Sequence, residues 1–394
     1  MTPMIEFEDF TFKYRAQMEP TLCDINLKIC PGEKVLIVGP SGSGKSTLAH
    51  CINGLVPFSY SGEIHGTYRV KGQDPSQLGI FGLSKSVGTV LQDTDGQFVG
   101  LTVAEDIAFA LENDSVPERQ MHDRVQQAAD TVDVGALLIH APGELSGGQK
   151  QRVSMAGVMV SDVDILLFDE PLANLDPATG KKTIALIDRI RNEYGKTVVI
   201  IEHRLEDALY RDVDRIIVVS EGRIVADTSP DELLAQDVLE RCGIREPLYL
   251  TALKHAGCRI RKEDHPSHIE TMDPVNYRQQ VQEWFAKTEG RQPESARDEI
   301  LHVKDLCFSY TENIPVLENI SFSIGKGEMI SIVGKNGAGK STLSALICGF
   351  YEPDRGSIFL HGSDIAKLSI KERGEHIGAG HAESQSDDQQ AHDL

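Results

Sequence analysis

KVLIVGPSGSGKSTLAH, residues 34–50, decides the fold of this chain. The apolar run KVLIV predicts a buried strand, and a helical segment follows the glycine-rich loop GPSGSGKST. Glycines let backbone N–H groups turn toward phosphate oxygens, and the N-terminus of the next helix adds partial positive charge. A chance glycine-rich turn is the alternative, but strand, loop and Lys-Ser-Thr stand here in the required order. The predicted nucleotide ligands are Gly39, Pro40, Ser41, Gly42, Ser43, Gly44, Lys45, Ser46 and Thr47, with Lys45 on the β- and γ-phosphates and Ser46 on Mg²⁺.

A second copy of this unit starts about 296 residues after the first. IEFEDFTFKY ends at Tyr14, and LHVKDLCFSY ends at Tyr310. PVLENISFSIGKGEMISIVGKNGAGKST (315–342) matches residues 20–47 almost position for position. The repeat therefore predicts a second phosphate-binding loop. Its ligands would be Gly334, Lys335, Asn336, Gly337, Ala338, Gly339, Lys340, Ser341 and Thr342, with Ser341 also a metal ligand.

Short apolar runs alternate with helical stretches in the first copy. The predicted strands are 34–38, 164–168, 197–201 and 215–219, and a helix is predicted to start near Pro117. Buried strands separated by helices predict an α/β fold with a mainly parallel sheet. Residues 236–298 differ: they are charge-balanced, predicted to be mixed or helical, and contain the chain's single tryptophan, Trp284.

The amino-acid composition limits the kinds of partner that the chain is expected to bind. The net charge of −21 argues against a protein that grips a nucleic-acid backbone, which needs a basic face. The seven cysteines form no CxxC pair, so we expect free thiols in a reducing compartment. The acidic N-terminal segment does not resemble a signal peptide, and no apolar run approaches the length of a membrane span. Any membrane role is expected to come through a partner.

The segment ILLFDE (165–170) places two acids after an apolar strand. Asp169 can help to hold Mg²⁺, directly or through its water shell, and Glu170 can polarise a water for attack on the γ-phosphorus. An apolar run that ends in Asp-Glu is often only a strand leaving the core. Because this run lies downstream of a phosphate-binding loop, we favour the metal and catalytic roles.

LSGGQKQR (145–152) opens a helix and offers a further ring of N–H donors for phosphate. LSGGQ is the signature of the ATP-binding cassette (ABC) ATPases, so the chain resembles this family of P-loop NTPases over its first copy and the front of its second. The resemblance implies two cassette domains that bind ATP and Mg²⁺. The implied signature ligands are Ser146, Gly147, Gly148 and Gln149.

The resemblance also implies roles for residues outside these motifs. Gln92 matches the glutamine that senses Mg²⁺ and the transport partner, and His203 matches the switch histidine that contacts the γ-phosphate. A lone histidine is more often structural, but His203 directly follows the strand TVVII, in register with the other motifs. Tyr14, and Tyr310 in the repeat, match the aromatic residue that stacks on adenine. Residues 174–176 match the loop that crosses between cassettes.

Finer features resemble the ATPases of energy-coupling factor importers: PLANLDP (171–177), EHRLED (202–207) and GIREPLYLTALKHAG (243–257). The tandem arrangement with a linker resembles the ATPase of thiamine-precursor (hydroxymethylpyrimidine) importers. This implies ATP-driven uptake of a vitamin or related small solute through separate transmembrane coupling and substrate-binding subunits. The expected location is peripheral, on the cytoplasmic side of the cell membrane, with no nucleic-acid partner.

The second copy is shorter than the first. Lys45 and Ser146 are 101 residues apart, so a second signature would fall near position 441, beyond Leu394. Codons permitted by the polar tail GHAESQSDDQQAHDL (380–394) read VMQNPNQMISKHMI when one base is removed, which sets VMQ opposite residues 90–92. We therefore expect that a one-base frameshift truncated this copy; a natural polar tail is the alternative.

Four parts are predicted. They are a complete first ABC ATPase domain (1–235), an inter-cassette linker domain (236–298), the start of a second ABC ATPase domain (299–379) and the aberrant tail (380–394). In the family, each ATP lies between the P-loop of one cassette and the signature of another. We therefore expect little ATPase activity from a monomer and a need for another cassette, as a homodimer or heterodimer.

Two other functions stay open at this point. A tandem-cassette ATPase acting on ribosomes or nucleic acid would also carry a linker, but that linker should be strongly basic, whereas residues 236–298 are charge-balanced. The other is a remnant that binds nucleotide without coupling it to transport.

Overall fold

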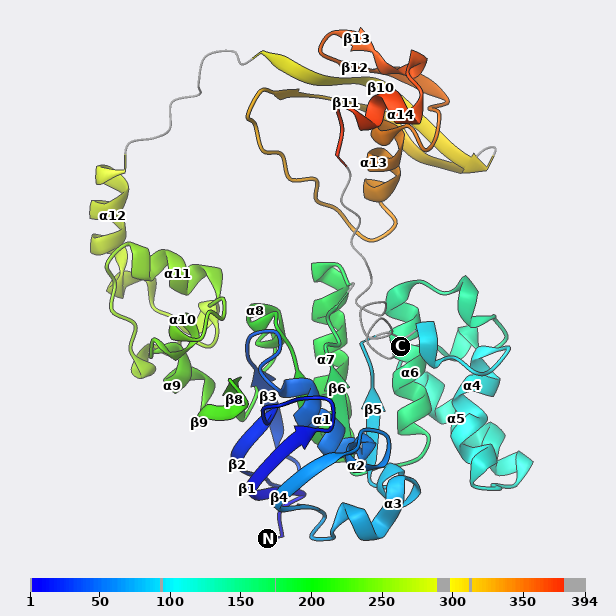
Figure 1. Ribbon diagram of the computed structural model, residues 1–394, viewed down its shortest axis with the longest axis vertical. Helices are drawn as coiled ribbons and strands as arrows, with labels where there is room; N and C mark the ends of the chain where they lie inside the picture. The colour runs from blue at the N-terminus through cyan, green and yellow to red at the C-terminus, as the bar shows by residue number, and fades with distance from the viewer. Residues whose placement is uncertain (1, 93–94, 174, 289–297, 312–313, 379–394) are drawn as a thin grey trace. The chain divides into compact units, whose positions relative to one another are not determined.

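The chain folds into two units, Met1–Thr288 (unit 1) and Glu289–Leu394 (unit 2). The computed structural model in Figure 1 describes residues 2–92, 95–173, 175–288, 298–311 and 314–378. Across these ranges no helix is both long and apolar enough to cross a bilayer. The predicted frameshifted tail, 380–394, lies outside the described residues.

The core of unit 1 is a six-stranded sheet in the order β5-β6-β7-β3-β8-β9. All neighbouring strands are parallel except β8 and β9, which pair antiparallel. The four apolar runs predicted as strands form β3, β6, β7 and β8, so the predicted α/β fold is confirmed. The strands are β3 (Lys34–Val38), β5 (Val87–Val90), β6 (Ile165–Asp169), β7 (Thr197–Ile201), β8 (Arg215–Ser220) and β9 (Arg223–Thr228).

The central strand β3 separates two hydrophobic cores. Its alternating side chains point to opposite faces of the sheet, as the pleat requires. Leu36 and Val38 join the core under the helices, whereas Val35 and Ile37 join the core under a second, antiparallel sheet. That sheet has the order β2-β1-β4 and consists of β1 (Ile5–Tyr14), β2 (Leu22–Ile29) and β4 (Gly62–Val70).

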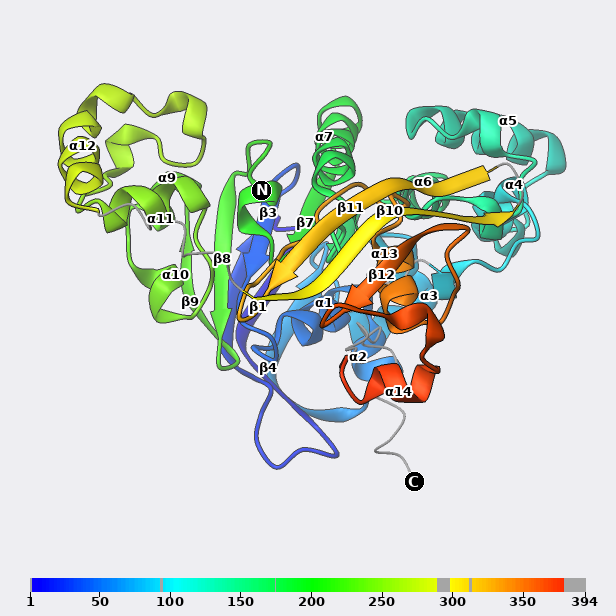
Figure 2. The same ribbon diagram turned by 90° about the horizontal axis from the view of Figure 1, so that it is seen from above.

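Helices of unit 1 begin where the sequence supplies caps. Thr102 and Glu105 form a capping box at α4, and Asp176 caps α7, whose first residue is Pro177. The predicted helix near Pro117 is confirmed as α5. Figures 1 and 2 show α4, α5 and α6 grouped as a lobe beyond the β5 edge. The helices are α1 (Lys45–Asn53), α2 (Leu55–Phe58), α3 (Pro75–Ser84), α4 (Val103–Asn113), α5 (Glu118–Thr131), α6 (Gly147–Met159), α7 (Pro177–Tyr194) and α8 (Leu205–Ala208).

The predicted linker is helical and follows α9 (Pro230–Leu234), which packs on the β8–β9 edge of unit 1, opposite to β5 (Figure 1). Its side chains Leu250, Ile260 and Tyr277 belong to the same hydrophobic core as the cassette helices. The structure therefore places residues up to Thr288 in one unit with the first copy. The linker helices are α10 (Val238–Arg241), α11 (Leu248–His255) and α12 (Arg278–Lys287).

Unit 2 repeats the antiparallel part of unit 1. Its sheet has the order β11-β10-β12-β13, in which β10 pairs antiparallel with β11 and β12, as β1 does with β2 and β4. One helix, α13, follows the second phosphate-binding loop. The elements are β10 (Glu299–Thr311), β11 (Ile314–Gly325), β12 (Arg355–Leu360), β13 (Ser363–Asp364), α13 (Lys340–Cys348) and α14 (Ile370–Gly374).

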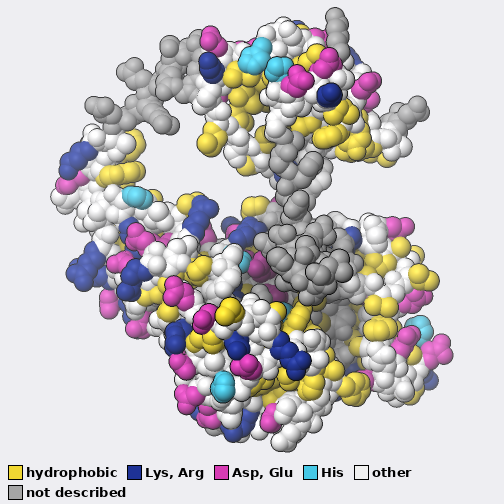
Figure 3. Space-filling model, in the orientation of Figure 1, with side chains coloured by type: hydrophobic (Ala, Val, Ile, Leu, Met, Phe, Trp, Pro, Cys, Tyr) yellow, Lys and Arg dark blue, Asp and Glu magenta, His cyan; other side chains and the backbone are white. Residues whose placement is uncertain are grey.

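The repeat aligns residues 329–333 (MISIV) with β3, yet this segment forms no strand. Met329 is 96% exposed and Val333 is 84% exposed, whereas every residue of β3 is buried. A strand needs hydrogen-bonding neighbours, and β3 has β7 and β8 on its two sides. Among the described residues of unit 2 no parallel strand is available. Figure 3 shows hydrophobic side chains on the surface of this unit.

Candidate functional site

The loop between β3 and α1 has the backbone geometry of a phosphate cradle. Gly42 and Gly44 have φ values of 75° and 103°, which favour glycine. The buried Lys45 donates from Nζ to the backbone oxygens of Gly39 (3.0 Å) and Pro40 (2.8 Å). Burial lowers the pKa of Lys45, and the nearby carboxylates Asp169 and Glu170 oppose that shift. The predicted lysine and the predicted acids are therefore brought together.

Asp169 and Glu170 lie at the carboxyl end of β6. Burial, together with the charge of Glu170, raises the pKa of Asp169 to about 6. Asp169 Oδ1 is buried and has no hydrogen-bond partner among the described residues. Carboxylate and hydroxyl oxygens are ligands that Mg²⁺ prefers, so Asp169 and Ser46, at the start of α1, fit a magnesium ion.

Glu170 is held by the predicted switch histidine. His203 Nε2 lies 2.9 Å from Glu170 Oε1, and this hydrogen bond is the main cause of a lowered pKa at Glu170. Parallel pairing of β6 and β7 brings the two residues together, because each follows the carboxyl end of its strand. An aligned carboxylate–imidazole pair beside Lys45 can orient a water and stabilise the charge that develops in phosphoryl transfer.

Glu202 orients His203, and sequence reasoning gave it no role. Its carboxylate is buried and accepts backbone N–H groups from His203 (2.8 Å) and Arg204 (3.1 Å) through Oε1, and from Leu172 (3.0 Å) through Oε2. Burial raises the pKa of Glu202. The available signal was an acid at the end of an apolar strand, the same signal that identified Asp169.

Gln92 lies on the same side of the sheet as Glu170, where the parallel strands β5 and β6 have their carboxyl ends. It follows β5, whose last residue, Val90, pairs with Phe168 of β6, two residues before Glu170. Gln92 is exposed, as are the apolar side chains Leu91 and Leu101 nearby in the sequence. Of the predicted crossing loop 174–176, Asn174 lies outside the described residues.

Tyr14 stands over the loop at the end of β1. Its hydroxyl lies 3.0 Å from Thr47 Oγ1, and burial raises its pKa. Tyr60 meets the Tyr14 ring edge-on at 6.1 Å, and His50 stacks on Tyr60 at 4.8 Å. Tyr60 and His50 were missed, because no local motif marks residues that meet only through folding.

The signature stretch lies at the start of α6. Ser146 donates from its N–H and from Oγ to Gln149 Oε1, both at 2.8 Å, so Gln149 folds back on the helix start. A Cβ on Gly147 would meet no atom within 4 Å, which leaves its backbone approachable. Within the described chain no hydrogen bond links Ser146–Gln149 to the Lys45 cluster.

The second loop reproduces the first in atomic detail. Lys340 Nζ donates to the backbone oxygens of Gly334 (2.9 Å) and Lys335 (2.8 Å). Tyr310 OH lies 3.0 Å from Thr342 Oγ1, as Tyr14 does from Thr47. The described part of unit 2 shows no acids at a parallel strand end and no switch histidine beside this loop.

Comparison with known proteins agrees with this geometry. The family model described as ABC transporter matches residues 22–173 and 317–392. The chain belongs to the ABC transporter family. A second model, described as ATP-binding cassette cobalt transporter, matches residues 236–308, which contain the linker.

Relatives of this ABC chain are longer than it is. It is 54% identical over 374 residues to a putative ABC transporter ATP-binding protein of Photobacterium profundum and 53% identical over 375 residues to one of Clostridium perfringens. In both comparisons the match covers 95% of this chain and 66% of the relative. The chain therefore spans a little under two thirds of their length.

Solved structures show the same ABC ATPase fold. CbiO1 from Clostridium perfringens, described as part of the ABC transporter complex CbiONQ, matches with a TM-score of 0.56 and 30% identity. That match covers 64% of this chain and all of CbiO1. A dimeric bacterial ABC transporter cassette matches with a TM-score of 0.51 and 29% identity, over 57% of this chain and 98% of the other.

Proposed function

We propose that this chain binds ATP and Mg²⁺ and hydrolyses ATP at the site around Lys45. The observation that carries the proposal is the convergence of Lys45, Asp169, Glu170 and His203 at one edge of the parallel sheet. Lys45 would bind phosphate oxygens, Asp169 and Ser46 would hold Mg²⁺, and Glu170 would accept a proton from the attacking water. Magnesium would neutralise charge on the phosphates when bound.

His203→Ala in the full chain tests this site. Loss of the group that orients Glu170 should lower the rate of Mg²⁺-dependent ATP hydrolysis by about 10²-fold. His122→Ala, on the exposed side of α5, is the matched control and should leave the rate unchanged. Equal rates for both variants would remove His203 from the site.

We also propose that hydrolysis requires a second cassette. Gly147 and Gly148 begin a helix whose N-terminus can bind an anion, yet no described contact joins them to Lys45. Two chains that pair through their first cassettes would each offer a signature to the other. Specific activity should then rise with protein concentration, whereas a constant specific activity at all concentrations would exclude this homodimer. The predicted division into 1–235, 236–298, 299–379 and 380–394 is retained as part of the proposal.

The transport role is proposed as the ATPase subunit of an importer, peripheral on the cytoplasmic side of the membrane. Exposed apolar side chains near Gln92 in the sequence offer a surface for a transmembrane subunit: Leu91 is 38% exposed, Val99 66% and Leu101 82%. Leu101→Asp should weaken copurification with that subunit and leave ATP binding unchanged. Unchanged copurification would place the contact elsewhere.

The solute is proposed to be a vitamin or related small molecule, as the resemblance to thiamine-precursor importers implies. Cobalt is the second candidate, because residues 236–308 match a family described as a cobalt transporter and CbiO1 is a structural relative. Uptake of labelled hydroxymethylpyrimidine and of cobalt, in cells with the native chain or Lys45→Ala, separates the two. The solute whose uptake needs Lys45 is the transported one.

A further inference from the structure

The linker of unit 1 contains a cavity of about 480 Å³ between α11 and α12. This volume lies within the range of small-molecule sites, about 300–1,000 Å³. The cavity does not involve the Lys45 site. Its main lining residues are Tyr249, Leu253, Met272, Tyr277, Arg278 and Trp284.

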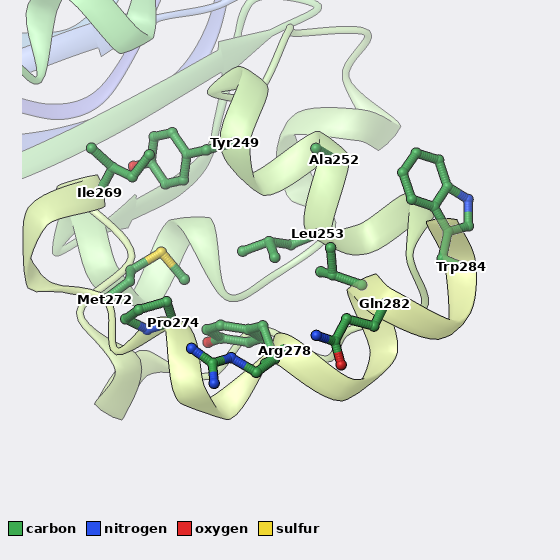
Figure 4. Close-up of a pocket in the computed structure, with 11 residues that line it drawn as sticks. Tyr249, Ala252, Leu253, Ile269, Met272, Pro274, Arg278, Gln282 and Trp284 are labelled. Atoms are coloured by element: carbon green, nitrogen blue, oxygen red, sulfur yellow. The ribbon is translucent and has the colours of Figure 1, made fainter. Parts of the chain in front are cut away.

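Apolar and aromatic side chains form the walls. Figure 4 shows Leu253 and Met272 facing one another, with Tyr249 above Met272 and Trp284 at the far side. Met272 is buried and shares the hydrophobic core of the cassette, and the Tyr249 hydroxyl donates to the Pro266 carbonyl at 2.5 Å. These contacts hold the walls in place. Flat aromatic faces and a polarizable thioether favour a planar apolar ligand.

Helix α12 contributes two polar side chains to the cavity. Arg278 and Gln282 are four residues apart, so they share one face of the helix. Within the described ranges Arg278 has no ion pair, and the neighbouring Glu283 accepts instead from Gln279 Nε2 at 2.9 Å. A free guanidinium binds a carboxylate, sulfonate or phosphate through two parallel hydrogen bonds.

We propose that this cavity binds a planar aromatic small molecule that carries an anionic group. The aromatic body would lie among Tyr249, Met272 and Trp284, and the anion would bind Arg278 with Gln282 beside it. This site shares no residue with the Lys45 site, and ligand binding here does not depend on nucleotide binding there.

Titration of the full chain with 8-anilinonaphthalene-1-sulfonate tests the proposal. Trp284 is the only tryptophan, so its emission reports directly on the cavity. The neutral probe N-phenyl-1-naphthylamine has the same rings without the sulfonate and isolates the role of charge. Arg278→Gln should raise the Kd of the sulfonate by about threefold to tenfold and leave the Kd of the neutral probe unchanged. Arg259→Gln, an exposed arginine outside the cavity, is the control and should change neither Kd.

Ala252→Phe fills the cavity from α11 and should raise the Kd of both probes by about tenfold or more. Three results would overturn the proposal: sulfonate binding that leaves Trp284 emission unchanged, equal affinity of the sulfonate for the native chain and Arg278→Gln, or binding unaffected by Ala252→Phe. Because Arg278 is exposed, its substitution should leave the fold intact. The effect of Arg278→Gln on the Kd of the sulfonate therefore tests the proposal even if Ala252→Phe misfolds.

Discussion

Lys45 in unit 1 and Lys340 in unit 2 make the same pair of hydrogen bonds to their own loops, but their surroundings differ. Lys45 is buried beside two carboxylates, whereas Lys340 is only partly buried and its loop is exposed. The loop geometry follows from nine local residues, because glycines and a helix start suffice to build it. The proposed catalytic groups depend on strands β6 and β7: β7 pairs with β3, and β6 pairs with β7, so these strands come together only in the fold.

The largest expected effect of a substitution is on the chemical step of ATP hydrolysis at the proposed site in unit 1. Glu170→Gln should lower the rate of ATP hydrolysis by about 10²–10⁴, because the amide cannot accept the proton of the attacking water. ATP binding should survive, since Lys45 and the loop are untouched. Single-turnover hydrolysis and nucleotide binding, measured on the same preparation, check both statements. Normal hydrolysis by this variant would remove Glu170 from its role.

Substitutions in the two aligned apolar segments, β3 and residues 329–333, should change the free energy of unfolding by different amounts. Ile37→Ala in β3 deletes a fully buried side chain and should lower the free energy of unfolding of unit 1 by about 2–5 kcal/mol. Val333→Ala, in the exposed segment of unit 2, should change stability by less than about 0.5 kcal/mol. Urea unfolding followed by circular dichroism measures both variants. A large loss for Val333→Ala would mean that residues 329–333 are buried in solution.

Adenine stacking offers a smaller test in the first copy. Tyr14→Ala should raise the Kd for ATP by about tenfold, as the loss of one aromatic–base contact predicts. Tyr14→Phe keeps the ring and loses only the hydrogen bond to Thr47, so its Kd should stay near the native value. Fluorescent-ATP titration distinguishes the two variants. An equal loss in both would assign the effect to the hydroxyl.

The smallest effect is a dependence of stability on pH. The pKa of Asp169 is about 6 in the folded chain and lower in the unfolded chain, so the folded state loses stability as pH rises through 6. Asp169→Asn should therefore stabilise unit 1 without nucleotide, by about 1 kcal/mol more at pH 8 than at pH 5.5. Asp123→Asn, on the exposed side of α5, is the control. A gain independent of pH would contradict the raised pKa.

Local motifs predicted the strands and the loop around which the nucleotide site is proposed. The strands at 34–38 and 197–201, the loop ligands and the acids after β6 all follow from runs of a few residues, and the structure places the four strands as predicted. Glu202 and Tyr60 were not predicted, because their roles arise from contacts made only in the fold. The exposed segment 329–333 carries nearly the same apolar pattern as β3, so pattern alone could not show that it lacks strand partners.

The contrast between the two loops is tested most directly by comparing Lys45→Ala with Lys340→Ala in the full chain. We expect Lys45→Ala to reduce Mg²⁺-dependent ATP hydrolysis by about 10²-fold or more, because its loop lies beside Asp169, Glu170 and His203. Lys340→Ala should leave the rate within about twofold of the native value, since Lys340 has no such neighbours in the described part of unit 2. Equal losses in the two variants would contradict the assignment of catalysis to unit 1.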